Sequence, residues 1–147
     1  MSYHIMIIDE DEVAADLIKD ALSLRGLYST LVAQGQGAAQ RIVEEKPDLV
    51  ILDMLLSDGD CEQICRLVRA QSSVPIILQT TRCAAAEGLL PINLGADDYV
   101  TKPCDPNEIA QKVEQLLQDR QVDEDVSILT RLAQFFVKTG RAEHRVL

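Results

Sequence analysis

Short runs of Ile, Leu and Val alternate along the chain with longer amphipathic segments, and this alternation limits the folds that the chain can adopt. The short runs show no polar alternation, which is typical of strands buried on both faces of a sheet. They predict strands at residues 4–8, 28–33, 49–52, 75–79 and 99–101. The segments between them predict helices at residues 12–25, 37–45, 60–70, 84–94 and 105–118, the fourth with the weakest pattern. Strands and helices in alternation predict an α/β fold, with a parallel sheet covered on both faces.

Composition and charge limit the partners of this fold. Hydrophobic residues make up 47 % of the 147 residues, enough for one domain with a real core. The formal net charge is −10, and all of it falls on residues 1–118, because residues 119–147 carry five bases and five acids. A surface this acidic argues against binding of nucleic acid or anionic membranes by residues 1–118. No secretory signal and no apolar run of bilayer length is visible, so we expect a cytoplasmic protein with no membrane partner.

Four cysteines bear on compartment and metal binding: Cys61, Cys65, Cys83 and Cys104. None belongs to a CxxC pair, so we expect buried, reduced thiols. A zinc site that combines Cys61 and Cys65 with a histidine is disfavoured. The two histidines lie at opposite ends of the chain, and no pair of residues has zinc-finger spacing.

The last part of the chain differs from the rest. Apolar residues recur there every three or four positions, at Val122, Val126, Leu129, Leu132 or Ala133, and Phe136. This spacing predicts an amphipathic helix, which must bury its apolar stripe on the domain, on a second copy or on a following domain. We therefore predict a domain over residues 1–118, with residues 119–147 as a helical extension or linker. A homodimer is one possible outcome.

Polar residues gather where the predicted strands end, and ligands of parallel sheets bind at that edge. They are Asp9, Glu10 and Asp11 after the first strand, Asp53 after the third, Thr80 and Thr81 after the fourth, and Lys102 after the fifth. Clustered carboxylates repel one another unless a positive charge lies among them. Several carboxylate oxygens suit a hard cation such as Mg²⁺.

This set of residues matches the needs of phosphoryl transfer. A carboxylate such as Asp53 can act as the nucleophile and form an aspartyl-phosphate. The rest of the reaction needs positioning and neutralised phosphoryl oxygens, which a cation, Lys102 and the Thr80 hydroxyl would supply. No Ser/His/Asp set, post-strand GxGxxG or Walker motif is present, so hydride transfer and nucleotide hydrolysis lack their residues.

Four stretches of the chain together resemble the response-regulator receiver domain of two-component signalling. They are IMIIDED (5–11), PDLVILDMLLSDGD (47–60), VPIILQTTR (74–82) and LGADDYVTKPCDPNEI (94–109). The resemblance implies a doubly wound, five-stranded parallel sheet with the flavodoxin-like strand order 2-1-3-4-5. It also implies a phosphoacceptor rather than an enzyme with a separate substrate.

Carried over by position, the resemblance implies that Asp53 accepts a phosphoryl group from a histidine kinase or a phosphotransfer protein. Glu10 and Asp53 would bind Mg²⁺ directly, together with the backbone carbonyl of Leu55, and Asp9 would act largely through water. Lys102 would hold a phosphoryl oxygen. The output would be a change in contacts with a downstream protein partner or effector domain.

The same resemblance makes Thr80 and Tyr99 a switch pair, in which the hydroxyl moves toward the phosphoryl group and the ring turns inward. Simpler interpretations remain open: Thr80 as a helix N-cap, Tyr99 as a rim residue, and the acids at 9–12 as helix N-terminal charges. Asp97 and Asp98 are expected to be solvated turn residues.

Some positions depart from the family pattern. The acidic pair is Asp-Glu, Ser57 and Cys61 stand where Pro and Gly are usual, and Thr81 stands where a smaller residue is frequent. Gly88 and Pro91 predict a short, bent or mobile fourth helix.

Two alternatives to a phosphorylated switch remain open. One is a receiver-like interaction domain that does not switch, and the other is a haloacid-dehalogenase-type phosphatase that uses Asp9 and Asp11.

Overall fold

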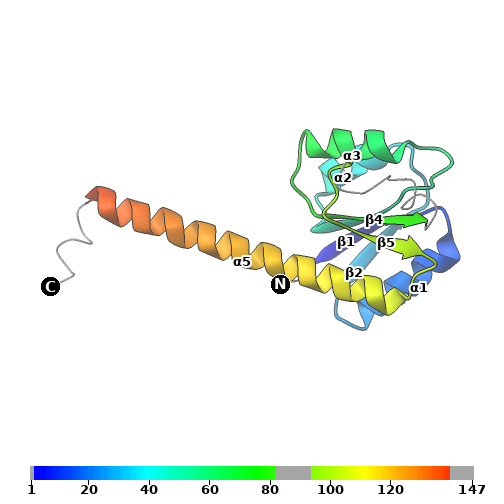
Figure 1. Cartoon of the computed structure of the whole chain (residues 1–147), viewed down its shortest axis with the longest axis horizontal. Helices are drawn as coiled ribbons and strands as arrows, with labels where there is room; N and C mark the ends of the chain where they lie inside the picture. The colour runs from blue at the N-terminus through cyan, green and yellow to red at the C-terminus, as the bar shows by residue number, and fades with distance from the viewer. Residues whose placement is uncertain (1, 82–93, 140–147) are drawn as a thin grey trace. The chain divides into compact units, whose positions relative to one another are not determined.

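A computed structural model describes residues 2–81 and 94–139, and in it five strands form one parallel sheet (Figure 1). The strands are β1 (His4–Ile8), β2 (Tyr28–Val32), β3 (Leu49–Asp53), β4 (Ile76–Thr81) and β5 (Asp98–Lys102). Their order is β2-β1-β3-β4-β5, and every neighbouring pair is parallel. The expected flavodoxin-like order is therefore confirmed.

Helices cover both faces of the sheet. They are α1 (Glu12–Ser23), α2 (Ala38–Glu45), α3 (Cys61–Arg69) and α5 (Pro106–Thr139). The α2 and α3 helices lie on one face, and α1 with the first turns of α5 lies on the other (Figure 1). The helix predicted near residues 84–94 lies almost wholly outside the described residues, as do Cys83, Gly88 and Pro91.

Side chains of each central strand divide between the two faces with the period of two that a strand imposes. In β1, Met6 and Ile8 belong to the core under α2 and α3, and Ile5 and Ile7 are buried on the opposite face. All residues of β3 are buried. Burial on both faces explains why these strands read as unbroken apolar runs in the sequence.

Acidic side chains begin two of the helices and thereby shape the loops at the carboxyl edge of the sheet. Asp11 is the N-cap of α1 and accepts a hydrogen bond from the Ala14 backbone N–H at 3.2 Å. Asp60 is the N-cap of α3 and accepts from the backbone of Glu62 at 3.0 Å. An N-cap oxygen satisfies a backbone donor that has no partner inside the helix, so each cap fixes where the preceding loop ends.

The helix predicted at 105–118 and the helical extension predicted after it form one uninterrupted helix, α5. The chain divides into two compact units, residues 1–113 and 114–147. In the first unit, Ile109, Ala110 and Val113 of α5 are buried. In the second unit, the predicted helical extension is confirmed. The residues of its predicted apolar stripe are between 43 % and 65 % exposed: Val122, Val126, Leu129, Leu132 and Phe136.

Two further expectations concern thiols and membranes. Cys61 and Cys65 are buried free thiols, as expected, whereas Cys104 is only partly buried. No helix in the described part of the chain combines the length and the apolar character needed to cross a bilayer.

Candidate functional site

The sheet carries Asp9, Asp53 and Lys102 to one edge. Asp9 directly follows β1, and its backbone N–H bonds to the Val32 carbonyl, while Asp53 and Lys102 are the last residues of β3 and β5. The sequence placed both residues just after their strands, whereas each is the last residue of its strand. The parallel pairing extends to Asp53 opposite Gln79 and to Lys102 opposite Thr81. Their side chains thus begin from ordered backbone.

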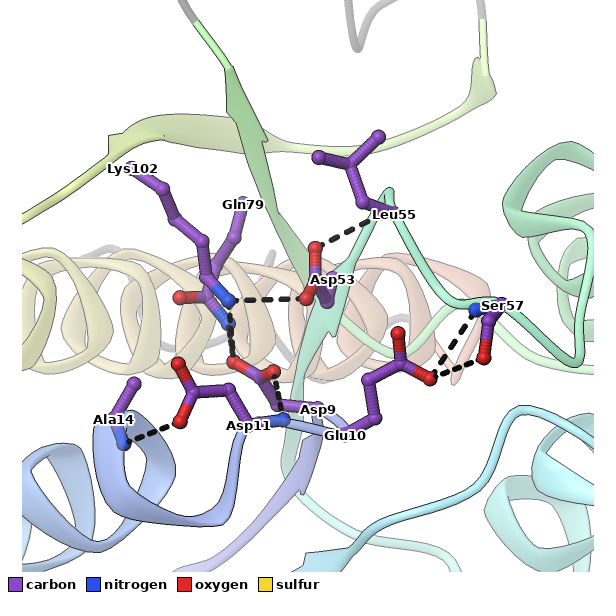
Figure 2. A network of polar contacts seen from close by, with 9 residues as sticks. All are labelled: Asp9, Glu10, Asp11, Ala14, Asp53, Leu55, Ser57, Gln79 and Lys102. Carbon is purple, nitrogen blue, oxygen red and sulfur yellow. Dashed lines mark hydrogen bonds and ion pairs between the residues drawn. The ribbon is translucent and has the colours of Figure 1, made fainter.

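Lys102 joins the two buried aspartates. Its Nζ donates to Asp9 Oδ2 at 2.8 Å and to Asp53 Oδ2 at 3.0 Å (Figure 2). Asp9 is 0 % exposed and Asp53 is 4 % exposed, so one ammonium lies between two carboxylates that water scarcely reaches. The positive charge offsets the repulsion that would otherwise make this pair of acids costly.

Burial and pairing act in opposite directions on these groups. Burial raises the pKa of the Asp53 carboxyl, and this effect outweighs the hydrogen bonds from the Leu55 backbone and Lys102, which lower it. For Lys102, burial lowers the pKa of the ammonium, but the hydrogen bonds to Asp9 and Asp53 together raise it. The site therefore keeps the lysine charged and makes the negative charge on Asp53 costly to maintain.

Backbone donors and one amide hold the two aspartates in place. The Leu55 N–H donates to Asp53 Oδ1 at 3.0 Å, and the Asp11 N–H donates to Asp9 Oδ1 at 2.9 Å. Gln79, only 2 % exposed, donates from Nε2 to Asp9 Oδ2 at 3.2 Å. Gln79 was not among the predicted site residues. No local signal marks it, because a glutamine that ends the apolar run 74–79 fits an exposed rim as well as a buried site.

Glu10 is drawn to the loop after β3. Its Oε2 accepts from the Ser57 hydroxyl at 2.7 Å and from the Ser57 backbone N–H at 3.2 Å (Figure 2). Within residues 2–81 and 94–139, no three His, Cys, Asp or Glu side chains are gathered as a metal cage. The donors still suit Mg²⁺ in kind, since this ion takes one or two carboxylates and retains waters. The direct role predicted for Glu10 remains a prediction.

Asp11, the second acid of the phosphatase alternative, is used as the N-cap of α1. This supports the helix N-terminal interpretation for that residue. A pocket of about 410 Å³ lies beside it, between α1 and the start of α5. Lys102, Gln79 and Cys104 are among its lining residues, so the Lys102 side of the site borders open space.

The predicted switch residues lie on the neighbouring strands β4 and β5. Thr80 is buried and its hydroxyl donates to the Thr81 carbonyl at 3.4 Å, while Tyr99 is 40 % exposed. In the strand register Tyr99 stands opposite Leu78, two residues before Thr80. Their roles as a switch pair, and that of the Leu55 carbonyl as a metal ligand, remain predictions.

Asp97 is an exposed residue of the bend before β5, as the sequence suggested, whereas Asp98 is partly buried in the strand and is not a turn residue. Asp97 Oδ2 accepts from Arg69 Nη2 and from the Ile76 backbone N–H, both at 2.8 Å. Asp98 is the first residue of β5 and pairs with Lys112 at 3.2 Å. Both carboxylates therefore fix the start of the strand that carries Lys102.

Comparison with known proteins assigns this arrangement to a family. The model of the response regulator receiver domain matches residues 5–114. The DNA-binding response regulator MtrA of Mycolicibacterium smegmatis is 33 % identical over 130 residues, which are 88 % of this chain and 57 % of the relative. This chain thus spans little more than half the length of that relative.

Solved structures agree with the sequence comparison. The receiver domain of the TMAO respiratory system response regulator TorR is 31 % identical, with a TM-score of 0.72 over 80 % of this chain and 98 % of that one. A two-component response regulator from Clostridium difficile is also 31 % identical, with a TM-score of 0.71 over 79 % and 96 % of the two chains. The family match, the strand order of the sheet and the pairing of Lys102 with two aspartates at the sheet edge agree with one another. The chain therefore belongs to the response regulator receiver domains of two-component signal transduction.

Proposed function

We propose that this receiver accepts a phosphoryl group on Asp53 from the phosphohistidine of a sensor kinase or a phosphotransfer protein, in a reaction that depends on Mg²⁺. The observation that carries the proposal is the placement of Lys102 Nζ at 2.8 Å from Asp9 and 3.0 Å from Asp53 at the carboxyl edge of the sheet. Such an edge is where ligands of parallel α/β sheets bind.

The proposed transfer needs one covalent exchange. A carboxylate oxygen of Asp53 attacks phosphorus, an O–P bond forms as the P–N bond of the phosphohistidine breaks, and the electron pair of that bond returns to the imidazole. Lys102 offsets charge on a phosphoryl oxygen, and the Thr80 hydroxyl donates to another. The domain acts on itself and needs no separate substrate to turn over.

The metal would be held by Asp53, Glu10 and the Leu55 carbonyl, with Asp9 acting through water. When bound, Mg²⁺ supplies positive charge to the phosphoryl oxygens and to the clustered carboxylates. The buried Asp9–Asp53 pair supports this assignment, because a single ammonium offsets only part of the charge of the two acids.

Phosphorylation would bias two conformations of the domain through the new contacts that the phosphoryl group makes. Thr80 and Tyr99 would respond to the phosphorylation. The Thr80 hydroxyl would move toward Asp53, and the Tyr99 ring would turn inward. The output would be a changed affinity for a downstream protein partner or effector domain. The relative named above is a DNA-binding response regulator. We propose that residues 1–118 of this chain do not contact nucleic acid, since they carry the whole net charge of −10.

The test is incubation of the 147-residue chain with a small phosphodonor and Mg²⁺, followed by intact-mass measurement. Expected is a gain of one phosphoryl group that Asp53→Ala abolishes and Lys102→Ala strongly reduces. Asp16→Ala, which removes an exposed acid of α1, is the matched control and should label normally.

Three results would overturn parts of the proposal. Labelling of Asp53→Ala would place the phosphoacceptor elsewhere. Turnover of a phosphate ester that survives Asp53→Ala would favour the phosphatase that uses Asp9 and Asp11. Uptake without any change in tyrosine fluorescence, oligomeric state or partner affinity would favour the receiver-like interaction domain that does not switch.

A further inference from the structure

The pocket beside Lys102, between α1 and the first turn of α5, has the build of a small-molecule site. Its volume of about 410 Å³ lies within the range of pockets that hold small ligands. Most of its lining is apolar and comes from both helices and the loop before α5: Ala14, Leu17, Ile18, Pro103, Pro106 and Ile109. Asp11 and Gln79 are among the few polar residues of the lining. An apolar pocket with a few placed polar groups is the usual form of a ligand site.

The orientation of the Gln79 amide gives the pocket a hydrogen-bond acceptor. Gln79 is 2 % exposed, and its Nε2 donates to Asp9 Oδ2, which also accepts from Lys102. Because a carboxylate only accepts, the amide nitrogen must face Asp9, and the amide oxygen must face elsewhere. Figure 2 shows this oxygen at the left of the network, on the side of Asp11 and Ala14, without a bond to any of the residues drawn. A buried amide oxygen needs a donor, and the pocket can admit one.

Asp11 adds a second acceptor and a negative charge to the same end of the pocket. Its Oδ1 accepts from the Ala14 backbone N–H at 3.2 Å, and Figure 2 shows its other oxygen on the side where the Gln79 oxygen lies. Two acceptors and a carboxylate charge select a ligand that donates hydrogen bonds and is positively charged. Lys102 does not oppose this charge, since its ammonium is offset by Asp9 at 2.8 Å and Asp53 at 3.0 Å.

We propose that this pocket binds a small organic cation with an apolar body. An ammonium, amidinium or guanidinium head donates to Gln79 Oε1 and to Asp11, and the apolar body packs between α1 and the start of α5. The site is separate from the proposed Mg²⁺ site, to which Asp53, Glu10 and the Leu55 carbonyl were assigned. Binding here does not require phosphorylation of Asp53, and its test uses no phosphodonor. Failure of one proposal can therefore be told from failure of the other.

The first experiment titrates the full 147-residue chain with benzamidine and follows its amide signals by NMR. Benzamidine joins a flat apolar ring to an amidinium, and a dissociation constant of about 1 mM is expected for so small a ligand. The shifts should centre on the Gln79 side-chain amide, Ala14 and Ile109. Benzoate has the same ring with a negative head and should not bind. Saturating Mg²⁺ should leave the benzamidine affinity unchanged within about twofold, because the two ligands use different groups.

The second experiment removes the two acceptors one at a time. Asp11→Asn keeps a good helix N-cap but removes the charge, and it should raise the dissociation constant of benzamidine by roughly tenfold. Asp16→Asn removes an exposed acid of the same helix that does not line the pocket, and it is the matched control. Gln79→Leu keeps the volume, removes the amide oxygen and should weaken binding by roughly fivefold or more. The amide spectrum of each variant shows whether it is folded, and Asp11→Asn decides the test if Gln79→Leu does not fold.

The third experiment tests the shape of the pocket. Ala14→Phe places a ring where the apolar body of the ligand should lie, and it should abolish benzamidine binding. Val13→Phe places the same ring on the neighbouring residue, which is 74 % exposed and does not line the pocket, and it should bind as the parent does.

Four outcomes would overturn the proposal. The first is no binding of benzamidine up to about 10 mM. The second is benzoate that binds as tightly, which would show that no positive charge is selected. The third is displacement by Mg²⁺, which would place the cation at the metal site instead. The fourth is equal weakening by Asp11→Asn and Asp16→Asn, which would show general attraction to an acidic surface.

Discussion

Glu10 and Ser57, 47 residues apart in the sequence, are joined by two hydrogen bonds to a single oxygen, Glu10 Oε2. These two bonds link the loop after β3, which follows the proposed phosphoacceptor, to the loop after β1. Figure 2 shows the second carboxylate oxygen of Glu10 turned away from Ser57. This geometry leaves that oxygen for a cation while Ser57 fixes the orientation of the side chain, as partners of metal ligands commonly do.

We therefore expect Ser57→Ala to weaken Mg²⁺ binding. Loss of one hydrogen bond to a charged group on an exposed side chain corresponds to about 1 kcal/mol, or about fivefold in affinity. The measurement is a Mg²⁺ titration of the apo protein by calorimetry. Ser23→Ala, at the exposed end of α1, should bind Mg²⁺ as the parent does. Tighter binding by Ser57→Ala would mean instead that the hydroxyl competes with the cation for Glu10.

Gln79 yields a prediction about stability. Gln79→Leu keeps the volume but removes the 3.2 Å donor to buried Asp9, and it should lower the free energy of unfolding by about 1 kcal/mol, partly offset by apolar burial. Gln79→Glu places a second negative charge there and should cost at least about 3 kcal/mol at neutral pH. Urea unfolding measures both. If Gln79→Glu matched Gln79→Leu, the amide would not face Asp9 in solution.

The sign of the pH effect separates these two variants further. A buried glutamate beside Asp9 ionises less readily in the folded chain than in the unfolded one, so its cost falls as the pH is lowered. Unfolding curves of Gln79→Glu should therefore approach those of Gln79→Leu between neutral and mildly acidic pH. Parallel curves over that range would contradict the burial of the introduced group.

Asp58 gives a prediction in the opposite direction. Its carboxylate accepts from the Gly35 N–H at 2.8 Å and the Gln36 N–H at 3.4 Å, and the Gly35 bond is the main cause that lowers the pKa of Asp58 below its ordinary 3.8. A lowered pKa means that the stabilisation is present above pH 3.8 and is lost as the pH falls below it. Asp58→Asn should be less stable than the parent at pH 7, and the gap should narrow as the pH falls below 3.8.

Urea midpoints at several pH values measure this effect. Asp16→Asn removes an exposed charge from α1 and controls for the change in net charge alone. A gap between Asp58→Asn and the parent that is constant with pH would show that the carboxylate charge does not matter for the loop. The contact is otherwise tight, since a Cβ on Gly35 would lie only 3.1 Å from the Gly59 Cα.

The parts of the fold that could be predicted from sequence rest on local patterns. Apart from His4 at the start of β1, the residues of β1 and β3 are buried, and they are apolar up to the functional acid, so the strand ends could be located. Because parallel strands end at one edge, the meeting of Asp9, Asp53 and Lys102 followed from those strand ends. The family resemblance supplied the strand order.

Contacts between distant residues had no local signal. Gln79 and Asp9 lie 70 residues apart, and a glutamine at the end of an apolar run fits a solvated rim as well as a buried bond. Asp97 is the turn residue that was predicted, but its bond to Arg69, 28 residues away, had no local signal. The continuity of α5 was different: no Gly or Pro interrupts residues 107–139, and this absence indicates one helix even though the apolar stripe changes phase.

Arg69 and Arg66, three residues apart on α3, offer a matched pair for the last prediction. Arg69 donates to the Val74 carbonyl at 2.6 Å, the Gly95 carbonyl at 2.7 Å and Asp97 at 2.8 Å. It thus joins the end of α3 to the segments that lead into β4 and β5. Among residues 2–81 and 94–139, Arg66 pairs only with Glu62 on its own helix, and both side chains are more than half exposed.

Arg69→Ala should lower the free energy of unfolding by about 2–4 kcal/mol, because two backbone carbonyls and a carboxylate lose a charged donor at once. Arg69→Lys should recover little of this loss, since an ammonium cannot reproduce the fork of the guanidinium that reaches three acceptors. Arg66→Ala should change the free energy of unfolding by less than about 0.5 kcal/mol, as expected for an exposed pair within a helix. Urea denaturation of the three variants beside the parent measures these values. Equal losses for Arg69→Ala and Arg66→Ala would mean that the Arg69 contacts do not persist in solution, and that another element fixes the strand that carries Lys102.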